Sequence, residues 1–329
     1  MEYKSTDISK LITEILEEKK EKGGVKSLYF VGCGGSLGAL YPAKTFMEKE
    51  CAGIKSAWIN SNEFVHSTPK DFGENSILCL ACHKGNTPET IRAAALGKEA
   101  GAAVIILTWL QESEIIRYGN YIVRYEFGGD KDTAGEKTIC ALLVAVELLQ
   151  QTEGYENYDK FLLGVGRIDR IVKNACKHVE KRALVFAENH KDDQVIYTMA
   201  SGAGYGAAYM ESICIFMEMQ WINSNSIHSG EYFHGPFEIT DANIPFVIQI
   251  SEGSTRELDE RALKFLTTYA KRIEVLDAKD LGLSTIESSV VDYFNHSLFN
   301  NVYPVYNQAL AMVREHPLST RRYMWKVEY

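Results

Sequence analysis

Two side chains that can exchange protons lie close together in the second half of the chain. Glu218 lies in the apolar run 213–222, where a carboxylate is costly to ionise because its surroundings solvate charge poorly. We therefore expect its pKa to rise toward the range that is useful for proton transfer. His234 follows 16 residues later, before a Gly-Pro turn in the sequence Gly-Glu-Tyr-Phe-His-Gly-Pro of residues 230–236. These residue types predict a general acid–base pair.

Other interpretations of these residues remain open at this stage. Glu218 also fits a salt bridge or a polar stripe of its own helix. A second pair, Glu50 and His66, has the same spacing. Glu50 ends a charged run that is typical of a solvated helix end, and no Gly-Pro follows His66. We therefore predict that Glu218 and His234 are the catalytic residues.

Two glycine-containing turns in the first half are suited to binding a phosphate. The first, residues 32–36, follows an apolar strand and includes Gly35 and Ser36. The second, residues 83–87, follows a strand expected at 76–81. A turn between a strand and a helix presents unpaired backbone N–H groups and the positive end of the helix dipole to an anion. Each turn alone could be a simple helix cap, but two of them in neighbouring strand–helix units favour a phosphate site.

The chain contains an internal repeat with a fixed offset of 168 residues. Seven identities occur without a gap over roughly fifty positions, which is hard to obtain by chance. We expect the boundary within 153–168, so the predicted domains are 1–160 and 161–329. Lys84 corresponds to Glu252, which would repel a phosphate, and the anion site is therefore expected in the first copy. The seven pairs are Gly34 and Gly202, Gly38 and Gly206, Ser61 and Ser229, Glu63 and Glu231, His66 and His234, Gly85 and Gly253, and Thr87 and Thr255.

Strands and helices are expected to alternate in each copy. An amphipathic helix with its apolar face at 8–16 should end at the Gly-Gly pair 23–24. Apolar strands are expected at 27–31, 76–81 and 103–108, each followed by a helix. This alternation is typical of parallel βαβ units. The predicted fold class is α/β, with each copy a parallel sheet flanked by helices in three layers.

Composition and charge exclude several classes of function. The 329 residues suffice for two domains of ordinary size. The net charge of −9 argues against a nucleic-acid partner, which would need a basic face. The longest apolar stretch, 102–110, is about half of what a bilayer crossing needs. The first 20 residues lack an apolar signal core. We expect a cytoplasmic protein without a membrane partner.

The seven cysteines are scattered and odd in number, which is typical of free thiols in a reducing compartment. Cys79 and Cys82 form a C-x-x-C sequence that could be redox-active or half of a zinc site. No second pair completes four ligands, so we interpret both as buried structural thiols. Histidines other than His66 and His234 show no ligand spacing with nearby carboxylates or cysteines, and no metal site is expected.

These motifs resemble those of the sugar isomerase (SIS) domain family, in which two such domains bind a phosphosugar. Within the family, the chain is most similar to the deglycases that cleave fructoselysine 6-phosphate and other fructosamine 6-phosphates. The similarity covers nearly the whole chain, and its most specific parts are residues 217–222, residues 230–238 and the tail 316–329. The turn within 81–90 resembles the family's serine-rich phosphate loop.

The resemblance implies a homodimer with active sites at the interface and with Glu218 and His234 as the catalytic pair. It also implies that the tail brings a basic residue, Arg321 or Arg322, to the sugar, although a solvated charge pair is an alternative. Cys82 and Lys84 stand where the family often has serines, and Lys84 could strengthen phosphate binding. The residues expected to bind the substrate or its phosphate are Gly35, Ser36, Cys82, His83, Lys84, Asn86, Thr87, Glu231 and Arg322.

The implied reaction is hydrolysis of a fructosamine 6-phosphate to glucose 6-phosphate and a free amino acid by acid–base catalysis, without a metal or other cofactor. An aldose–ketose phosphosugar isomerase would use the same proton transfer without hydrolysis. An aminating synthase is disfavoured because a glutaminase domain with an N-terminal cysteine would precede the repeat, whereas Met1 is followed here by Glu2. A non-catalytic sugar-phosphate sensor is a further alternative, but a sensor would usually carry a DNA-binding or partner segment.

Overall fold

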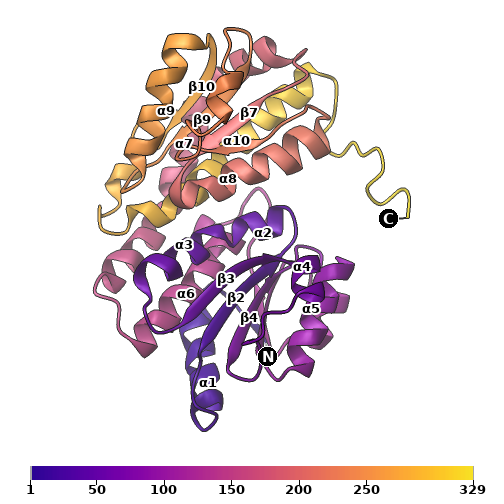
Figure 1. Cartoon of the computed structure of the whole chain (residues 1–329), viewed down its shortest axis with the longest axis vertical. Coiled ribbons are helices and arrows are strands. Elements are labelled where there is room, and N and C mark those ends of the chain that lie inside the picture. Colours follow the sequence, from indigo (N-terminus) through magenta and orange to yellow (C-terminus); the bar gives the residue numbers. More distant parts are fainter. Residues whose placement is uncertain (1, 329) are drawn as a thin grey trace. The chain divides into compact units, whose positions relative to one another are not determined.

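The computed structural model describes residues 2–328, which form two compact units (Figure 1). The first unit extends to Gly166, and the second begins at Arg167. Each unit is built on its own parallel sheet with helices packed on it, which confirms the predicted α/β class. Within the described residues, no helix is long and apolar enough to cross a membrane.

The first unit contains a six-stranded parallel sheet in the order β1-β6-β5-β4-β2-β3. Every residue of β2, β4 and β5 is buried. Such continuous apolar strands are typical of parallel sheets, because helices cover both faces. The strands are β1 (Glu2–Tyr3), β2 (Ser27–Gly32), β3 (Lys55–Asn60), β4 (Ser76–Ala81), β5 (Ala103–Thr108) and β6 (Tyr121–Arg124).

Helices cover this sheet on two sides, which makes three layers (Figure 1). Helix α6 packs against α1 and α3, and α4 packs against α5. The first helix buries Ile8, Leu11 and Ile15, the apolar face that the sequence predicts. The helices are α1 (Ile8–Lys20), α2 (Gly35–Ala39), α3 (Tyr41–Glu50), α4 (Ser61–His66), α5 (Pro88–Glu99) and α6 (Lys137–Thr152), with short 3-10 helices at Ser5–Asp7, Glu114–Tyr118 and Thr133–Gly135.

The second unit contains a four-stranded parallel sheet in the order β10-β9-β7-β8. Helix α9 packs on β9, and α10 packs against α8. A π-helix at Glu211–Met219 continues α8 directly. The strands are β7 (Tyr197–Ala200), β8 (Ser226–His228), β9 (Pro245–Ile250) and β10 (Arg272–Asp277). The helices are α7 (Tyr158–His190), which begins in the first unit, α8 (Tyr205–Met210), α9 (Arg256–Tyr269) and α10 (Asn295–Val313), with 3-10 helices at Gly202–Gly204, Pro236–Ile239, Leu283–Thr285 and Val291–Phe294.

The two units repeat the same arrangement of strands. The order β5-β4-β2-β3 in the first unit matches β10-β9-β7-β8 in the second, and each strand begins within three residues of the predicted offset. Gly34 and Gly202, which the repeat pairs, have φ of 53° and 52°, a backbone region that L side chains rarely adopt. These agreements support the predicted duplication. The copies differ at α4, which is a helix, whereas the corresponding residues 229–234 form a series of turns.

The expected boundary between the domains is mostly helical. Helix α7 begins at Tyr158 and runs through most of the expected boundary segment 153–168, and the compact units divide within this helix, after Gly166. The helix buries Phe161, Ile168 and Val172, which fall on one face of a helix. The polar residues between them, Arg167, Asp169 and Arg170, lie on the more exposed side of this helix.

The tight turn at Gly253 gives the first prediction. Its φ is 112°, and a Cβ added there would lie 1.4 Å from Asp292 Oδ1. We expect Gly253→Ala to lower the free energy of unfolding by roughly 2–4 kcal/mol, because it combines backbone strain with a steric clash. Urea unfolding followed by circular dichroism would measure the change.

Gly166→Ala is the matched control, because Gly166 lies inside α7 and an added Cβ there meets no atom within 4 Å among the described residues. That substitution should be neutral or should stabilise the protein by about 1 kcal/mol. Equal losses for both variants would contradict the assigned role of Gly253.

Candidate active site

Glu218 lies near the end of the π-helix Glu211–Met219. The wider turns of this helix are visible in the hydrogen bond that the Gln220 N–H donates to the carbonyl of Ile215, five residues earlier, at 2.8 Å. Beyond the helix, the Ile222 N–H donates to the Phe216 carbonyl at 2.8 Å. Short π-helical segments occur frequently at functional sites. Trp221, which follows, has φ of 57°, an uncommon conformation for a bulky residue that also concentrates at such sites.

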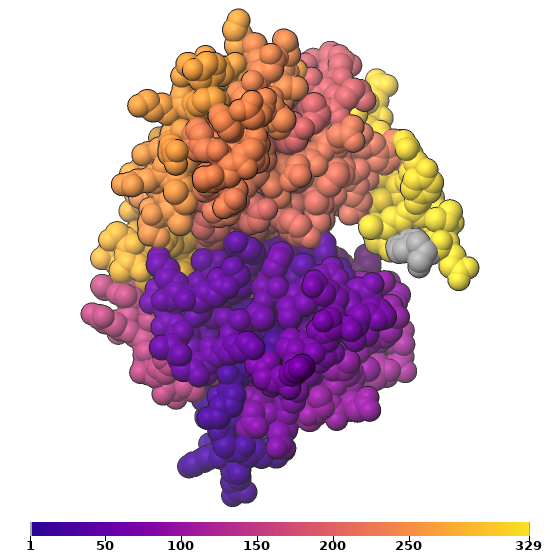
Figure 2. Space-filling view, in the orientation of Figure 1, coloured from indigo at the N-terminus to yellow at the C-terminus, as the bar shows by residue number. Residues whose placement is uncertain are grey.

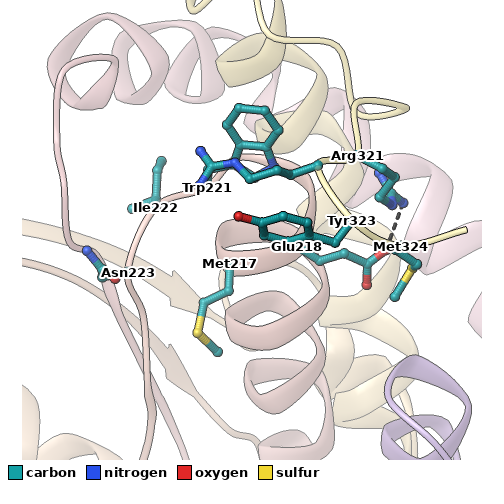
Figure 3. A pocket seen from close by; sticks show the side chains of 9 residues that line it. Met217, Glu218, Trp221, Ile222, Asn223, Arg321, Tyr323 and Met324 are labelled. Atoms are coloured by element: carbon teal, nitrogen blue, oxygen red, sulfur yellow. Dashed lines mark ion pairs between the residues drawn. The ribbon is translucent and has the colours of Figure 1, made fainter. Parts of the chain in front are cut away.

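An ion pair joins Glu218 to the C-terminal tail. Glu218 Oε1 lies 2.8 Å from Arg321 Nη2, and the two side chains are 22% and 10% exposed (Figure 3). Burial raises the pKa of Glu218 above its usual value, although the charge of Arg321 and its hydrogen bond act in the opposite direction. The raised pKa that the sequence predicts is confirmed in direction, and the salt bridge that we considered as an alternative is also present.

A pocket of about 450 Å³ opens beside this ion pair (Figure 3). Its volume lies in the range of small-molecule sites, about 300–1,000 Å³. The end of the π-helix, the loop that follows it and the tail form its walls, all from the second unit. The described residues that line it are Met217, Glu218, Trp221, Ile222, Asn223, Arg321, Arg322, Tyr323 and Met324.

Hydrogen bonds attach the tail to the end of the π-helix. Gln220 Nε2 donates to the His316 carbonyl at 2.8 Å, and the His316 ring packs edge-on against Trp221. Arg321 Nη1 donates to the carbonyls of Leu318 and Thr320, each at 2.8 Å. The same guanidinium therefore shapes the tail and contacts Glu218. Figure 2 shows the end of this tail, in yellow, at the surface of the molecule.

A second carboxylate of the π-helix, Glu211, is fully buried. Its Oε2 accepts a hydrogen bond from Asn307 Nδ2 at 3.0 Å. Burial raises the pKa of Glu211 to about 8, so this carboxyl group is largely protonated at pH 7. It lies outside the residues that line the pocket, and we assign it a structural role.

The structure does not bring His234 to Glu218 within the second unit. His234 is exposed in the turn after β8, where its N–H donates to the Glu231 carbonyl at 2.9 Å. Glu231 is also exposed, and neither residue is among the described residues that line the pocket. In the first unit, Glu50 ends α3, and exposed His66 ends α4.

The two predicted phosphate-binding turns lie at the carboxyl ends of adjacent strands, β2 and β4. Gly35 and Ser36 begin α2, and Ser36 Oγ accepts a hydrogen bond from Lys137 Nζ at 3.2 Å. In the second turn, Lys84 and Asn86 are exposed and Cys82 is buried.

Thr87 occupies the N-cap position of α5. Among the described residues, its side chain accepts no hydrogen bond from the first turn of that helix. The Thr87 hydroxyl therefore does not cap the helix. Its predicted role as a hydrogen-bond donor to a ligand stays a prediction.

The His83 ring contacts two aromatic residues. Its Nδ1 lies 2.6 Å from the Tyr125 hydroxyl, and its ring stacks on Trp109. Burial, together with the charges of Lys137 and Lys84, lowers the pKa of His83 to about 4, while burial raises the pKa of Tyr125. A neutral imidazole has one donor and one acceptor nitrogen, so His83 has a second ring nitrogen, Nε2, with which it can hydrogen-bond a ligand.

In the second unit, the protein's own side chains fill the corresponding turn. Asn295 Oδ1 accepts a hydrogen bond from the Glu252 N–H, and Asp292 Oδ1 accepts one from the Ser254 N–H, both at 2.8 Å. Asp292 Oδ2 also accepts from Ser254 Oγ at 2.7 Å. A carboxylate thus contacts backbone donors of the turn whose counterpart we expect to bind a phosphate, which supports placing the anion site in the first copy.

Sequence reasoning missed Lys137, Tyr125 and Trp221. Lys137 and Tyr125 contact the predicted turns from about 40 to 100 residues away, and no local motif marks them. Trp221 lies inside the apolar run 213–222 that contains Glu218 and inside the segment 217–222 that carries the resemblance, and these were its signals.

The cysteines agree with the structural interpretation. All seven are free thiols, and Cys79 and Cys82 are buried. Burial raises the pKa of Cys79 to about 12, which makes it a poor nucleophile. Within residues 2–328, no cluster of histidine, cysteine and acidic side chains has the arrangement of a metal site.

Comparisons with known proteins place both units among phosphosugar proteins, although no protein-family model matches the chain. The chain is 39% identical to the fructosamine deglycase FrlB of Bacillus subtilis over 329 residues, 100% of both chains. It is 25% identical over 273 residues to the fructoselysine 6-phosphate deglycase of Escherichia coli, covering 83% of this chain and 78% of that protein. A crystal structure from Salmonella typhimurium LT2, described as a candidate phosphosugar isomerase, is 45% identical, with a TM-score of 0.94 over 99% of both chains.

The ion pair predicts how Glu218 titrates. Arg321→Gln removes the cation that favours the ionised carboxylate, so the pKa of Glu218 should rise further and the group should stay protonated to a higher pH. Carboxyl ¹³C NMR of glutamate-labelled protein, with Glu218→Gln to assign the signal, would measure the shift.

Arg322→Gln is the control for this titration. It also removes a positive charge from the pocket, but that guanidinium lies over the Trp221 ring, 4.2 Å from its centroid. We expect a smaller rise than for Arg321→Gln. A pKa of Glu218 that stays constant or falls in Arg321→Gln would refute the proposed balance between burial and charge.

Proposed function

The chain belongs to the sugar isomerase (SIS) domain family of phosphosugar proteins, and we propose that it is a deglycase for fructosamine 6-phosphates. It would hydrolyse fructoselysine 6-phosphate or a related compound to glucose 6-phosphate and a free amino acid. The observation that carries this proposal is Glu218, a partly buried carboxylate with a raised pKa in a pocket of substrate size. The full-length similarity to the Bacillus subtilis fructosamine deglycase supports the choice of substrate class.

The proposed reaction needs only proton transfers and water. The substrate has a ketone at C2 and a methylene at C1 that carries the amine. Removing a proton from C1 and protonating the C2 oxygen gives an enaminol. Returning a proton to C2, as the nitrogen loses one, gives an imine between C1 and the nitrogen. Water adds to that imine, and the C1–N bond breaks to release the amine and glucose 6-phosphate.

We assign the transfer between C1 and C2 to Glu218. A general base works best when its pKa is close to the working pH, and burial moves Glu218 in that direction. His234 would protonate and deprotonate the ketone or ring oxygen. Because His234 is exposed and lies outside the pocket, we propose that it acts on the pocket of a second copy in a homodimer. Each group could supply about 10²–10⁴-fold in rate.

The first unit would bind the phosphate. Ser36 and the 83–87 turn supply hydroxyl and backbone donors, and Lys84 and Lys137 supply positive charge. His83 would add a donor at Nε2, in the tautomer whose Nδ1 accepts the Tyr125 hydroxyl proton. Phosphate binding would contribute by orienting the sugar for proton transfer.

An aldose–ketose phosphosugar isomerase is the second candidate. The 45% identical Salmonella typhimurium structure, described as a candidate phosphosugar isomerase, favours it. The two functions share the proton transfer between C1 and C2 and differ in whether an amine is released. An amine assay on a panel of fructosamine 6-phosphates therefore separates them.

The catalytic assignment can be tested by substitution. Glu218→Gln keeps the shape of the side chain but removes the proton acceptor, so release of glucose 6-phosphate from fructoselysine 6-phosphate should fall by at least about 10²-fold. His234→Asn should have a similar effect. The controls are Glu50→Gln and His66→Asn, the repeat-related pair, which should change turnover little. Near-normal turnover by Glu218→Gln would remove Glu218 from the mechanism.

Mixing the two inactive variants tests the role of the homodimer. If His234 serves the pocket of another copy, a mixed dimer of Glu218→Gln and His234→Asn chains contains one complete site and one site that lacks both groups. Equal mixing with free exchange of subunits should then restore about a quarter of wild-type activity. If both groups act within one chain, mixing should restore nothing. The wild-type protein, mixed with itself after the same exchange, is the control.

A further inference from the structure

The pocket beside Glu218 contains a second arginine that the proton transfer does not use. We propose that Arg322, stacked on Trp221, forms the subsite for the amino-acid part of the substrate and binds its carboxylate. This inference rests on the proposed deglycase function and deepens it, because it names the group that the pocket recognises. Arg322 lines the pocket together with Glu218, and its guanidinium carbon lies 4.2 Å from the centroid of the Trp221 ring.

The charges in the pocket leave Arg322 uncompensated. Glu218 and Arg321 neutralise each other at 2.8 Å. Among the described residues, no carboxylate forms an ion pair with Arg322. The pocket therefore carries a net positive charge next to the proposed base, which suits a substrate that brings one anionic group to this place.

Trp221 holds the guanidinium in a useful orientation. Stacking on an aromatic face leaves the edge of the guanidinium, with its fork of N–H donors, available for a carboxylate. A second aromatic ring, Tyr323, has its centroid 6.0 Å from Arg322. Trp221 itself packs against the His316 ring. The exposed Arg322 side chain therefore has aromatic partners that limit its orientation.

The connectivity of the substrate decides which anion lies here. Glu218 would remove a proton from C1, and C1 is the atom that carries the amine. The substituents of that nitrogen must then lie next to Glu218, whereas the phosphate is at C6, the other end of the sugar chain. The carboxylate of an amino acid joined through its α-nitrogen lies only three bonds from C1, so the subsite is proposed for α-linked compounds. In fructoselysine, which is joined through the ε-nitrogen, the carboxylate lies seven bonds from C1. Met217 and Met324 line the same pocket and provide apolar, adaptable surface for a side chain.

A matched pair of substrates isolates the carboxylate. The 6-phosphates of fructose-glycine and fructose-glycinamide have nearly the same size and share the sugar and the phosphate. Only the glycine compound has a negatively charged carboxylate, which is a neutral amide in the other. The wild-type protein should prefer the glycine compound by about 10- to 100-fold in kcat/KM, the range expected for a hydrogen-bonded charge pair. Arg322→Gln should abolish this preference, because kcat/KM should fall much further for the glycine compound than for the glycinamide compound.

Two further variants complete the design. Arg322→Lys keeps the charge but loses the planar fork, so its preference should be intermediate. Lys264→Gln removes an exposed positive charge from α9, away from the pocket, and should keep the wild-type preference. Retained turnover of the glycinamide compound shows that a variant is folded and has a working base.

The outcomes separate this inference from the proposed function. Equal losses for both substrates in Arg322→Gln and Arg322→Lys would overturn the inference, because Arg322 would then contact the shared sugar or phosphate or support the fold. A wild-type protein that does not discriminate would overturn it as well. If the wild type hydrolyses neither substrate, the deglycase function fails. Calorimetry with the Glu218→Gln protein then decides the subsite alone: tighter binding of the glycine compound that Arg322→Gln abolishes supports it, and equal binding refutes it.

Discussion

The contact between Glu218 and Arg321 is the interaction on which the second unit's pocket depends. A carboxylate withdrawn from water becomes a stronger base, but complete withdrawal would keep it protonated at neutral pH. Glu211, in the same π-helix, shows that limit, because burial raises its pKa to about 8. Glu218 is intermediate between a carboxyl group in water and a fully buried one, since it is partly exposed and Arg321 lies 2.8 Å away. The guanidinium thus limits how far burial can raise the pKa.

Because Arg321 belongs to the tail, the order of the tail and the basicity of Glu218 are linked. The tail is attached through the hydrogen bond from Gln220 to the His316 carbonyl and through the carbonyls that Arg321 itself contacts. A ligand that contacts the tail would therefore change the electrostatic environment of the base as well as the shape of the pocket. The proposed contact between Arg322 and a substrate carboxylate lies next to Arg321 in this same segment.

The fold could be predicted from the sequence to a large extent, because its signals are local. Apolar runs at β2, β4 and β5, the glycines at the turns and the fixed offset between the copies are all visible in the order of residues. The candidate site residues Glu218 and Ser36 were proposed from equally local signals. The resemblance also named Arg321, but neither its contact with Glu218 nor that of Lys137 with Ser36 was predicted, because each joins positions about 100 residues apart. Such contacts depend on tertiary packing, which no short pattern encodes.

The π-helix has a consequence for how the two copies can be compared. The repeat aligns α3, an ordinary helix, with the end of α8 and the π-helix, without any inserted residue. Hydrogen bonds to the fifth preceding residue, instead of the fourth, make each residue turn through a smaller angle about the helix axis. Side chains at aligned positions therefore point in progressively different directions around the helix axis along this segment. Glu50 and Glu218 occupy equivalent positions in the repeat, but their side chains point in different directions from their helices. A change from an α-helix to a π-helix as the copies diverged would thus redirect a glutamate side chain without changing the residue type.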